Sequence, residues 1–219
     1  MNMKYSNYRF NMPIDDKVYR QLNKDASINS LFRSNKVGKC AKLFDDYYNS
    51  VDKIDSTEWY EYYLEMMPKV LVNTAMAITS LSMYDAFAYV KHRIIGQTWN
   101  GMLNEIALVK ELQQQFPNLT FEKADYNKDE QYFTDFECFS NGNLILGLQI
   151  KPITYKLMSS PYQLQAKENH NKQRELYKSV YKVPHFIIYH EKNELYDKEN
   201  VFNQINLLLT NLINQNNEQ

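Results

Sequence analysis

The feature that most constrains the fold of this chain is a pair of strand-like segments joined by a short turn. Phe133 to Phe139 is rich in aromatic and other strand-forming residues, and Leu144 to Lys151 is apolar except near its end. The Asn141-Gly142 pair between them is the strongest short signal for a hairpin turn. The sequence therefore predicts an antiparallel hairpin built from these two segments.

The polar residues of this hairpin are exceptions in an apolar stretch. Side chains alternate along a strand, so Gln149 and Lys151 share one face, as do Asp135 and Glu137 on the other strand. A simple two-residue turn would set Asp135 opposite Leu148, away from that face, so we predict a three-residue loop or one bulge. Glu137 lies nearer the turn, where we expect a solvated carboxylate.

Asp135 followed by Gln149-Ile150-Lys151 resembles the signature of the PD-(D/E)XK nucleases. In that superfamily an aspartate and a second acidic residue hold a divalent metal ion, and a lysine two residues later lies beside the attacking water. Thr134 stands where proline is usual, and Gln149 stands where an acid is usual. A glutamine offers a carbonyl oxygen but no charge, so we expect weaker metal binding unless another carboxylate compensates.

A helix before the hairpin supplies such a carboxylate. Apolar residues recur at helical spacing from Met102 to Phe116, and Pro117 follows. Glu105 lies about one turn inside this helix, and the superfamily resemblance implies that it completes the metal site. The plain alternative is that an acidic residue near a helix start interacts with the helix dipole alone.

Further segments are similar to the MjaI-type restriction endonucleases, which are small type II enzymes of this superfamily. They are Trp99-Asn100-Gly101, Glu105, the lone Asp135, and Gln149-Ile150-Lys151-Pro152-Ile153-Thr154-Tyr155-Lys156. The similarity is looser upstream, at Arg33 to Gly38 and at Trp59 to Glu65, and the proline expected after Arg33 is missing.

The predicted fold class is α/β, with a PD-(D/E)XK restriction-endonuclease-like core, a mixed central sheet flanked by helices. From Gln97 onward the expected order is helix, three strands, helix, strand and a last helix. Beyond the hairpin these are a strand near Thr120 to Ala124, a helix from Tyr162 to Tyr181, a strand from Val183 to His190 and a helix near Lys198 to Asn214. We expect residues 96–219 to form the nuclease core with its carboxyl-terminal helix.

Residues 1–95 are predicted to be mostly helical and to serve recognition and dimerisation. Helices are expected at Asp15 to Lys24, at Lys39 to Tyr48 and from Ser56, with Ser56 or Thr57 as the cap. The apolar stretch from Lys69 to Arg93 predicts one long buried helix or two, which Gly96 ends.

The charge of the chain is balanced overall but uneven along it. The 25 basic and 26 acidic residues give a net charge of −1, which does not indicate a nucleic-acid binder as a whole. The segment from Lys151 to Lys182, however, contains seven basic and two acidic residues, which gives it a local charge of +5. Candidate contacts to the DNA backbone are Lys156, Lys167, His170, Lys172, Arg174 and Lys178, and a solvated helix face is the alternative.

Cysteine content and hydropathy bear on the location of the protein. Two cysteines, Cys40 and Cys138, have no paired spacing, so neither a disulfide framework nor a zinc site is indicated. Residues 1–7 lack the apolar core of a signal peptide, and no apolar run approaches the roughly 20 residues of a membrane span. We expect a cytoplasmic protein without a membrane partner.

The leading hypothesis is a type II restriction endonuclease that hydrolyses double-stranded DNA with Mg²⁺ at a short palindromic site. Asp135, the Gln149 side-chain oxygen and Glu105 would hold the ion, with the Ile150 carbonyl added by the resemblance, and Lys151 would orient the nucleophile. The resemblance suggests a site such as CTAG, a homodimer and a cognate DNA methyltransferase. The alternatives are an inactive DNA-binding or interaction module on a nuclease fold and a structure-selective repair nuclease.

Overall fold

The computed structural model describes residues 8–11, 14–33, 37, 39–192 and 194–217, and side chains as far as residue 214. The chain divides into two compact units, one ending at Asn104 and one beginning at Glu105. The expectation about residues 1–7 and most of the segment from Arg33 to Gly38 lie outside the described residues.

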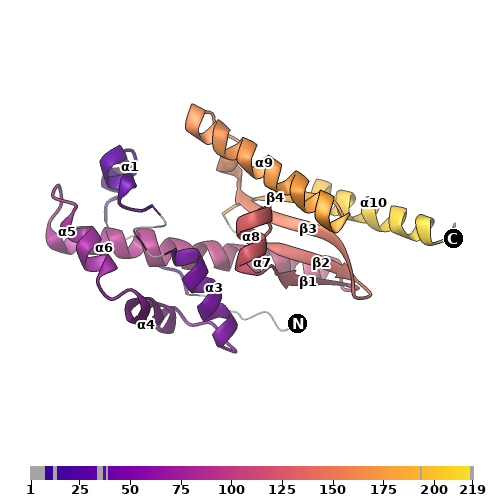
Figure 1. Cartoon of the computed structure of the whole chain (residues 1–219), viewed down its shortest axis with the longest axis horizontal. Helices are drawn as coiled ribbons and strands as arrows, with labels where there is room; N and C mark the ends of the chain where they lie inside the picture. Colours follow the sequence, from indigo (N-terminus) through magenta and orange to yellow (C-terminus); the bar gives the residue numbers. More distant parts are fainter. Residues whose placement is uncertain (1–7, 12–13, 34–36, 38, 193, 218–219) are drawn as a thin grey trace. The chain divides into compact units, whose positions relative to one another are not determined.

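The first unit is helical, as predicted (Figure 1). Its elements are α1 (Asp16–Leu22), α2 (Ala26–Ser30), α3 (Cys40–Ser50), α4 (Ser56–Met66), α5 (Val70–Met76), α6 (Met83–Lys91), the π-helix η1 (His92–Gly96) and the first half of α7 (Gln97–Gln115). Aromatic side chains form its core. Trp59 and Trp99 are fully buried, and the ring of Phe44 contacts both of them edge-on.

Two details of this unit differ from the predictions. Asp55 caps α4, because its carboxylate accepts the backbone N–H groups of Thr57 and Glu58. Gly96 does not end a helix, because η1 runs directly into α7. An added Cβ at Gly96 would lie 2.9 Å from the Cβ of Phe10, so the glycine permits a close contact instead.

The second unit contains a mixed five-stranded sheet in the order β1-β2-β3-β4-β5. The strands are β1 (Leu119–Lys123), β2 (Phe136–Ser140), β3 (Asn143–Pro152), β4 (His185–Glu191) and β5 (Glu194–Leu195). The β3–β4 pair is parallel and the other pairs are antiparallel. The α/β class is confirmed.

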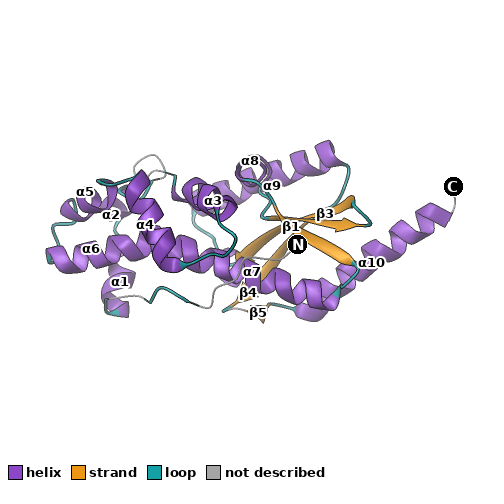
Figure 2. Cartoon of the chain, turned by 90° about the horizontal axis from the view of Figure 1, so that it is seen from below, coloured by secondary structure: helices purple, strands orange, loops and turns teal. Residues whose placement is uncertain are grey.

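Helices flank both faces of this sheet (Figures 1 and 2). Besides the second half of α7 they are α8 (Tyr126–Tyr132), the 3-10 turn η2 (Ile153–Tyr155), α9 (Pro161–Tyr181) and α10 (Lys198–Asn217). α8 and α9 cover the face that bears Gly147, against which the Tyr177 ring packs. α7 and α10 lie together, joined by the Phe116 and Phe202 rings and by an ion pair between Glu111 and Lys198.

The hairpin is confirmed, and so is its bulge. The turn residues Asn141 and Gly142 have φ values of 49° and 79°. Cys138 pairs with Leu146 but Phe139 pairs with Leu144, so β3 contains one extra residue. The bulge shifts the register by one and sets Phe136 opposite Leu148.

The first hairpin strand is shorter than predicted. It begins at Phe136, because Tyr132 ends α8 and Phe133 is left-handed. The helix α8, the 3-10 turn η2 and the short β5 were not predicted, whereas the predicted elements of this unit match within a few residues. In the first unit, α2 was not predicted.

Candidate active site

Asp135 lies in the short connection between α8 and β2, and backbone hydrogen bonds hold it on two sides. Its N–H donates to the carbonyl of Leu148 at 2.8 Å, and its carbonyl accepts the N–H of Ala124 at 2.9 Å. The residue is therefore tied to β3 on one side and to the end of β1 on the other. These two bonds hold its carboxylate beside the carboxyl-terminal part of β3.

The carboxylate of Asp135 contacts both residues predicted to share its site. Its Oδ2 accepts the side-chain Nε2–H of Gln149 at 2.5 Å and the backbone N–H of Ile150 at 2.7 Å. In an extended strand the N–H and C=O of one residue point to the same side, so the Ile150 carbonyl also faces Asp135. The predicted convergence of Asp135 and Gln149 is thus present.

Gln149 has one satisfied and one unsatisfied end. Its side chain is fully buried, and its Oε1 has no hydrogen-bond partner in the part of the chain that the structure describes. A buried carbonyl oxygen without a donor is unfavourable by about 1–3 kcal/mol. Such an oxygen, next to a carboxylate, is a suitable ligand for a hard cation.

Glu105, on α7, belongs to the same electrostatic environment. Burial raises its pKa well above the ordinary value, the negative charge of Asp135 raises it further, and Lys151 opposes both. Asp129, on α8, also raises the pKa of Glu105. The sequence did not suggest Asp129, because α8 itself was not predicted.

Lys151 shares the Gln149 face of β3 through strand alternation. Its side chain is half-buried, and its Nζ lies 4.7 Å from the centroid of the Phe133 ring. Asp135 contacts Gln149, so it is not on the opposite face of the sheet from Lys151. The structure therefore places the aspartate, the glutamine and the lysine on the same face of the sheet.

The donor set departs from a three-acid site. Among the residues that the structure describes, no three His, Cys, Asp or Glu side chains are grouped to hold a metal ion. The oxygen atoms of this cluster that could serve as ligands are the carboxylates of Asp135 and Glu105, the Gln149 amide oxygen and the Ile150 carbonyl. These are hard oxygen donors, so the residues present fit a divalent cation such as Mg²⁺.

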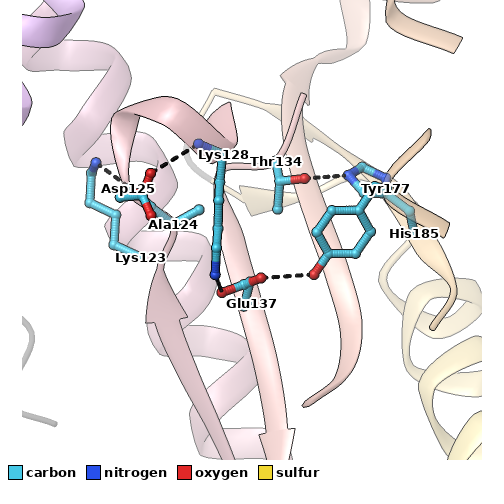
Figure 3. A network of polar contacts seen from close by, with 8 residues as sticks. All are labelled: Lys123, Ala124, Asp125, Lys128, Thr134, Glu137, Tyr177 and His185. Atoms are coloured by element: carbon cyan, nitrogen blue, oxygen red, sulfur yellow. Dashed lines mark hydrogen bonds and ion pairs between the residues drawn. The ribbon is translucent and has the colours of Figure 1, made fainter. Parts of the chain in front are cut away.

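Glu137 is not the solvated carboxylate that the sequence predicted. It is buried, pairs with Lys128 at 2.6 Å and accepts the hydroxyl of Tyr177 at 3.0 Å (Figure 3). Its strand partner is Gly147, which leaves room for the Tyr177 ring above the sheet. Burial raises the pKa of Tyr177, and the charge of Glu137 adds to this, so the phenol remains a donor.

The residue before Asp135 belongs to a second group of polar side chains, formed by Thr134, His185 and Arg174. Thr134, in the position of the usual proline, lies 3.1 Å from Nε2 of the buried His185 through its hydroxyl (Figure 3). Arg174 donates to His185 Nδ1 at 3.2 Å, so the neutral ring carries its proton on Nε2 and donates to Thr134. Burial lowers the pKa of His185 to about 4, which keeps the ring neutral.

A comparison with protein families identifies the kind of protein to which this site belongs. The family described as MjaI restriction endonuclease matches residues 20–206. The chain belongs to this family. It is therefore a restriction endonuclease, a DNA hydrolase of a family that implies a DNA substrate and a metal-dependent reaction. Comparisons with curated proteins and with solved structures give no match.

The six residues predicted to contact DNA divide into two groups in this endonuclease. Four contact residues of the unit that lie on other elements or in loops. Arg174 bonds His185, His170 stacks on Phe133, Lys167 donates to the carbonyls of Lys156 and Met158, and Lys156 lies over the rings of Tyr189 and Tyr196. Lys172 and Lys178 form exposed ion pairs with Glu168 and Glu175. Contact of any of the six with DNA stays a prediction.

Two further features concern the whole chain. Cys40 and Cys138 are free and buried, and burial raises the pKa of each thiol to about 12. Within the described ranges, no helix is both apolar enough and long enough to cross a bilayer.

Proposed function

We propose that this endonuclease is a type II enzyme that cleaves double-stranded DNA at a short palindromic site with Mg²⁺, on a PD-(D/E)XK core. The element order of the second unit supports this core, since an antiparallel β1-β2-β3 meander is followed by α9 and a parallel β4. The observation that carries the proposal is the Asp135–Gln149 contact, with the unsatisfied Gln149 Oε1 beside the carboxylate.

The cation would be held by Asp135, Gln149 Oε1, the Ile150 carbonyl and Glu105. When bound, it would polarise a phosphoryl oxygen and lower the pKa of a water molecule. Gln149 has a second task, because its amide donates to Asp135 and fixes the orientation of that carboxylate. The backbone N–H of Ile150 adds a second donor to the same oxygen.

Lys151 would act on the reacting phosphate. Its ammonium group can orient the attacking water and stabilise the negative charge of the transition state. Its three donors can rotate to meet that charge.

Recognition would involve parts of the chain outside this cluster. We propose that the outward side of α9, with Lys172 and Lys178, positions the DNA backbone. The helical residues 1–95 would read bases and form a two-fold interface in a homodimer, because a palindrome presents two equivalent half-sites. A site such as CTAG and a cognate methyltransferase follow from the family resemblance alone.

A digest of phage DNA tests the proposal directly. With Mg²⁺ the wild-type protein should give discrete fragments whose sequenced ends share one palindrome. Lys151→Ala should lower the single-turnover rate by roughly 10²-fold or more, since it removes charge stabilisation, and should leave metal-free duplex affinity unchanged. Asp135→Ala should abolish cleavage at every Mg²⁺ concentration.

Other outcomes would contradict the proposal. Duplex binding without any cleavage by the wild type would indicate an inactive module, with Gln149 as the mark of lost metal binding. Nicking that follows DNA structure would indicate a repair nuclease. Equal cleavage by wild type and both variants would place the chemistry elsewhere.

A further inference from the structure

The backbone of Phe133 adopts a conformation that bulky residues rarely take. Its φ is 56°, in the left-handed region, at the carboxyl-terminal cap of α8. Glycine or asparagine usually occupies such a cap. A buried phenylalanine is held there against its conformational preference, two residues before Asp135.

The Phe133 ring joins two side chains that are distant in sequence. Lys151 Nζ lies 4.7 Å from its centroid, which is within the range of a cation–π interaction. The imidazole of His170, on α9, is stacked on the same ring at 3.9 Å with an angle of 11° between the planes. A ring packed in this way has little freedom to rotate.

His170 has a second contact, through a ring nitrogen. Its Nδ1 lies 2.9 Å from the hydroxyl oxygen of Tyr155, a buried residue in η2. η2 directly follows β3, the strand that carries Lys151. The contacts therefore close a circuit from Lys151 through Phe133, His170 and Tyr155 back to the end of β3.

We propose that His170 is a positioning residue for Lys151 that acts through the Phe133 ring, an inference that rests on the proposed role of Lys151 in cleavage. The flexible lysine side chain gains a defined location from the face of a ring that His170 holds. The left-handed backbone of Phe133 would then serve to place its ring beside Lys151. Contact between His170 and a DNA phosphate is the competing interpretation.

Kinetics of His170 variants separate these interpretations. His170→Ala removes the stack, and a displaced ammonium should slow single-turnover cleavage by about 10- to 100-fold while metal-free duplex affinity stays unchanged. His170→Phe keeps a ring against Phe133 and should restore most of the rate. Asn169→Ala, at an exposed neighbour on α9, is the matched control and should cleave like the wild type.

Two results would overturn the proposal. If both His170 variants weaken duplex binding and reduce its salt dependence, the residue is a phosphate contact. If both variants cleave at the wild-type rate while Lys151→Ala does not, His170 has no part in positioning.

A measurement without DNA or metal keeps this inference separate from the proposed function. In protein with ¹³C-methylated lysines, the Phe133 ring current should shift the Lys151 signal upfield, and Lys151→Arg identifies that signal by its loss. His170→Ala should move the signal toward the position of an exposed lysine, and His170→Phe should not. An unmoved signal in His170→Ala overturns the inference even if the wild type cleaves; a moved signal supports it even if the wild type does not.

Discussion

At the scale of single residues, Gln149 combines two tasks that a glutamate could not. Its amide donates to Asp135, and its oxygen remains without a partner among the described residues. A glutamate would instead set two negative oxygens against each other in a buried place, where like charges repel strongly. The glutamine thus lets the site form without a cation, at the cost of one ligand charge.

This contrast predicts an opposite effect of Gln149→Glu with and without metal. In EDTA the repulsion should lower the Tm by about 2–8 °C, corresponding to roughly 1–2 kcal/mol in a chain of this length. Saturating Mg²⁺ should raise the Tm of the variant more than that of the wild type, and cleavage should survive. Thermal melts across a Mg²⁺ series measure both effects.

The matched control is Gln204→Glu, which adds the same charge at an exposed position on α10. It should show neither the loss in EDTA nor the larger response to Mg²⁺. A Gln149→Glu protein whose Tm ignores Mg²⁺ would contradict the assignment of this side chain as a ligand.

At the scale of elements, the sheet and α9 approach each other closely because one strand residue has no side chain. A Cβ at Gly147 would lie 2.5 Å from Cε1 of Tyr177 and 2.9 Å from Cδ2 of His185. The Tyr177 hydroxyl also holds the buried Glu137. Gly147 therefore sets the distance at which α9 brings its polar side chains to the candidate site.

Gly147→Ala should therefore destabilise the protein. The Tyr177 ring would have to shift, and overpacking of this kind costs about 1–3 kcal/mol. Gly101→Ala is the control, since no atom lies within 4 Å of an added Cβ there. In the interior of α7 that change should stabilise by about 0.5–1 kcal/mol. Urea unfolding of both variants gives the two signs, and equal signs would contradict the packing argument.

The elements that the sequence predicted well are those with a local signal. The turn residues and the alternation along β3 fixed both the hairpin and the need for a bulge, because register and face are linked. α8 was missed because none of its residues is buried, so no apolar periodicity marks it. As a result the strand was extended back to Phe133, and neither Asp129 nor the left-handed Phe133 could be foreseen.

At the scale of the whole molecule, the resemblance supplied the pattern from which the site residues were predicted, and their roles stay a prediction. The contact between Asp135 and Gln149 follows from that pattern and the register. The contacts of Glu137 and Arg174 could not be predicted from the sequence. Tyr177 contacts Glu137, and His185 contacts Arg174, in each case from a different element of the fold. Charge counting also could not separate basic side chains that face the sheet from those that face solvent.

The last prediction concerns Lys172 and Lys178, two basic residues of α9. Lys172 is exposed and Lys178 is half-buried, and each forms an ion pair with a glutamate of the same helix, which contributes little to stability. If α9 positions the DNA backbone, Lys172→Ala combined with Lys178→Ala should weaken metal-free duplex binding for all sequences alike. The slope of log affinity against log salt should become shallower by about 0.9 for each lost phosphate contact, or nearly two units in all.

The control removes the same charge from pairs of the same kind in the first unit, by Arg20→Ala combined with Lys42→Ala. Arg20 pairs with Asp16 and Lys42 with Asp46, each exposed and one helical turn apart. A general effect of net charge would weaken binding equally in both double variants, whereas a contact surface on α9 would change the slope only in the first. Titrations of a labelled duplex from low to moderate salt decide between them, and a slope in the Lys172 and Lys178 double variant equal to that of the wild type would exclude α9 as the DNA surface.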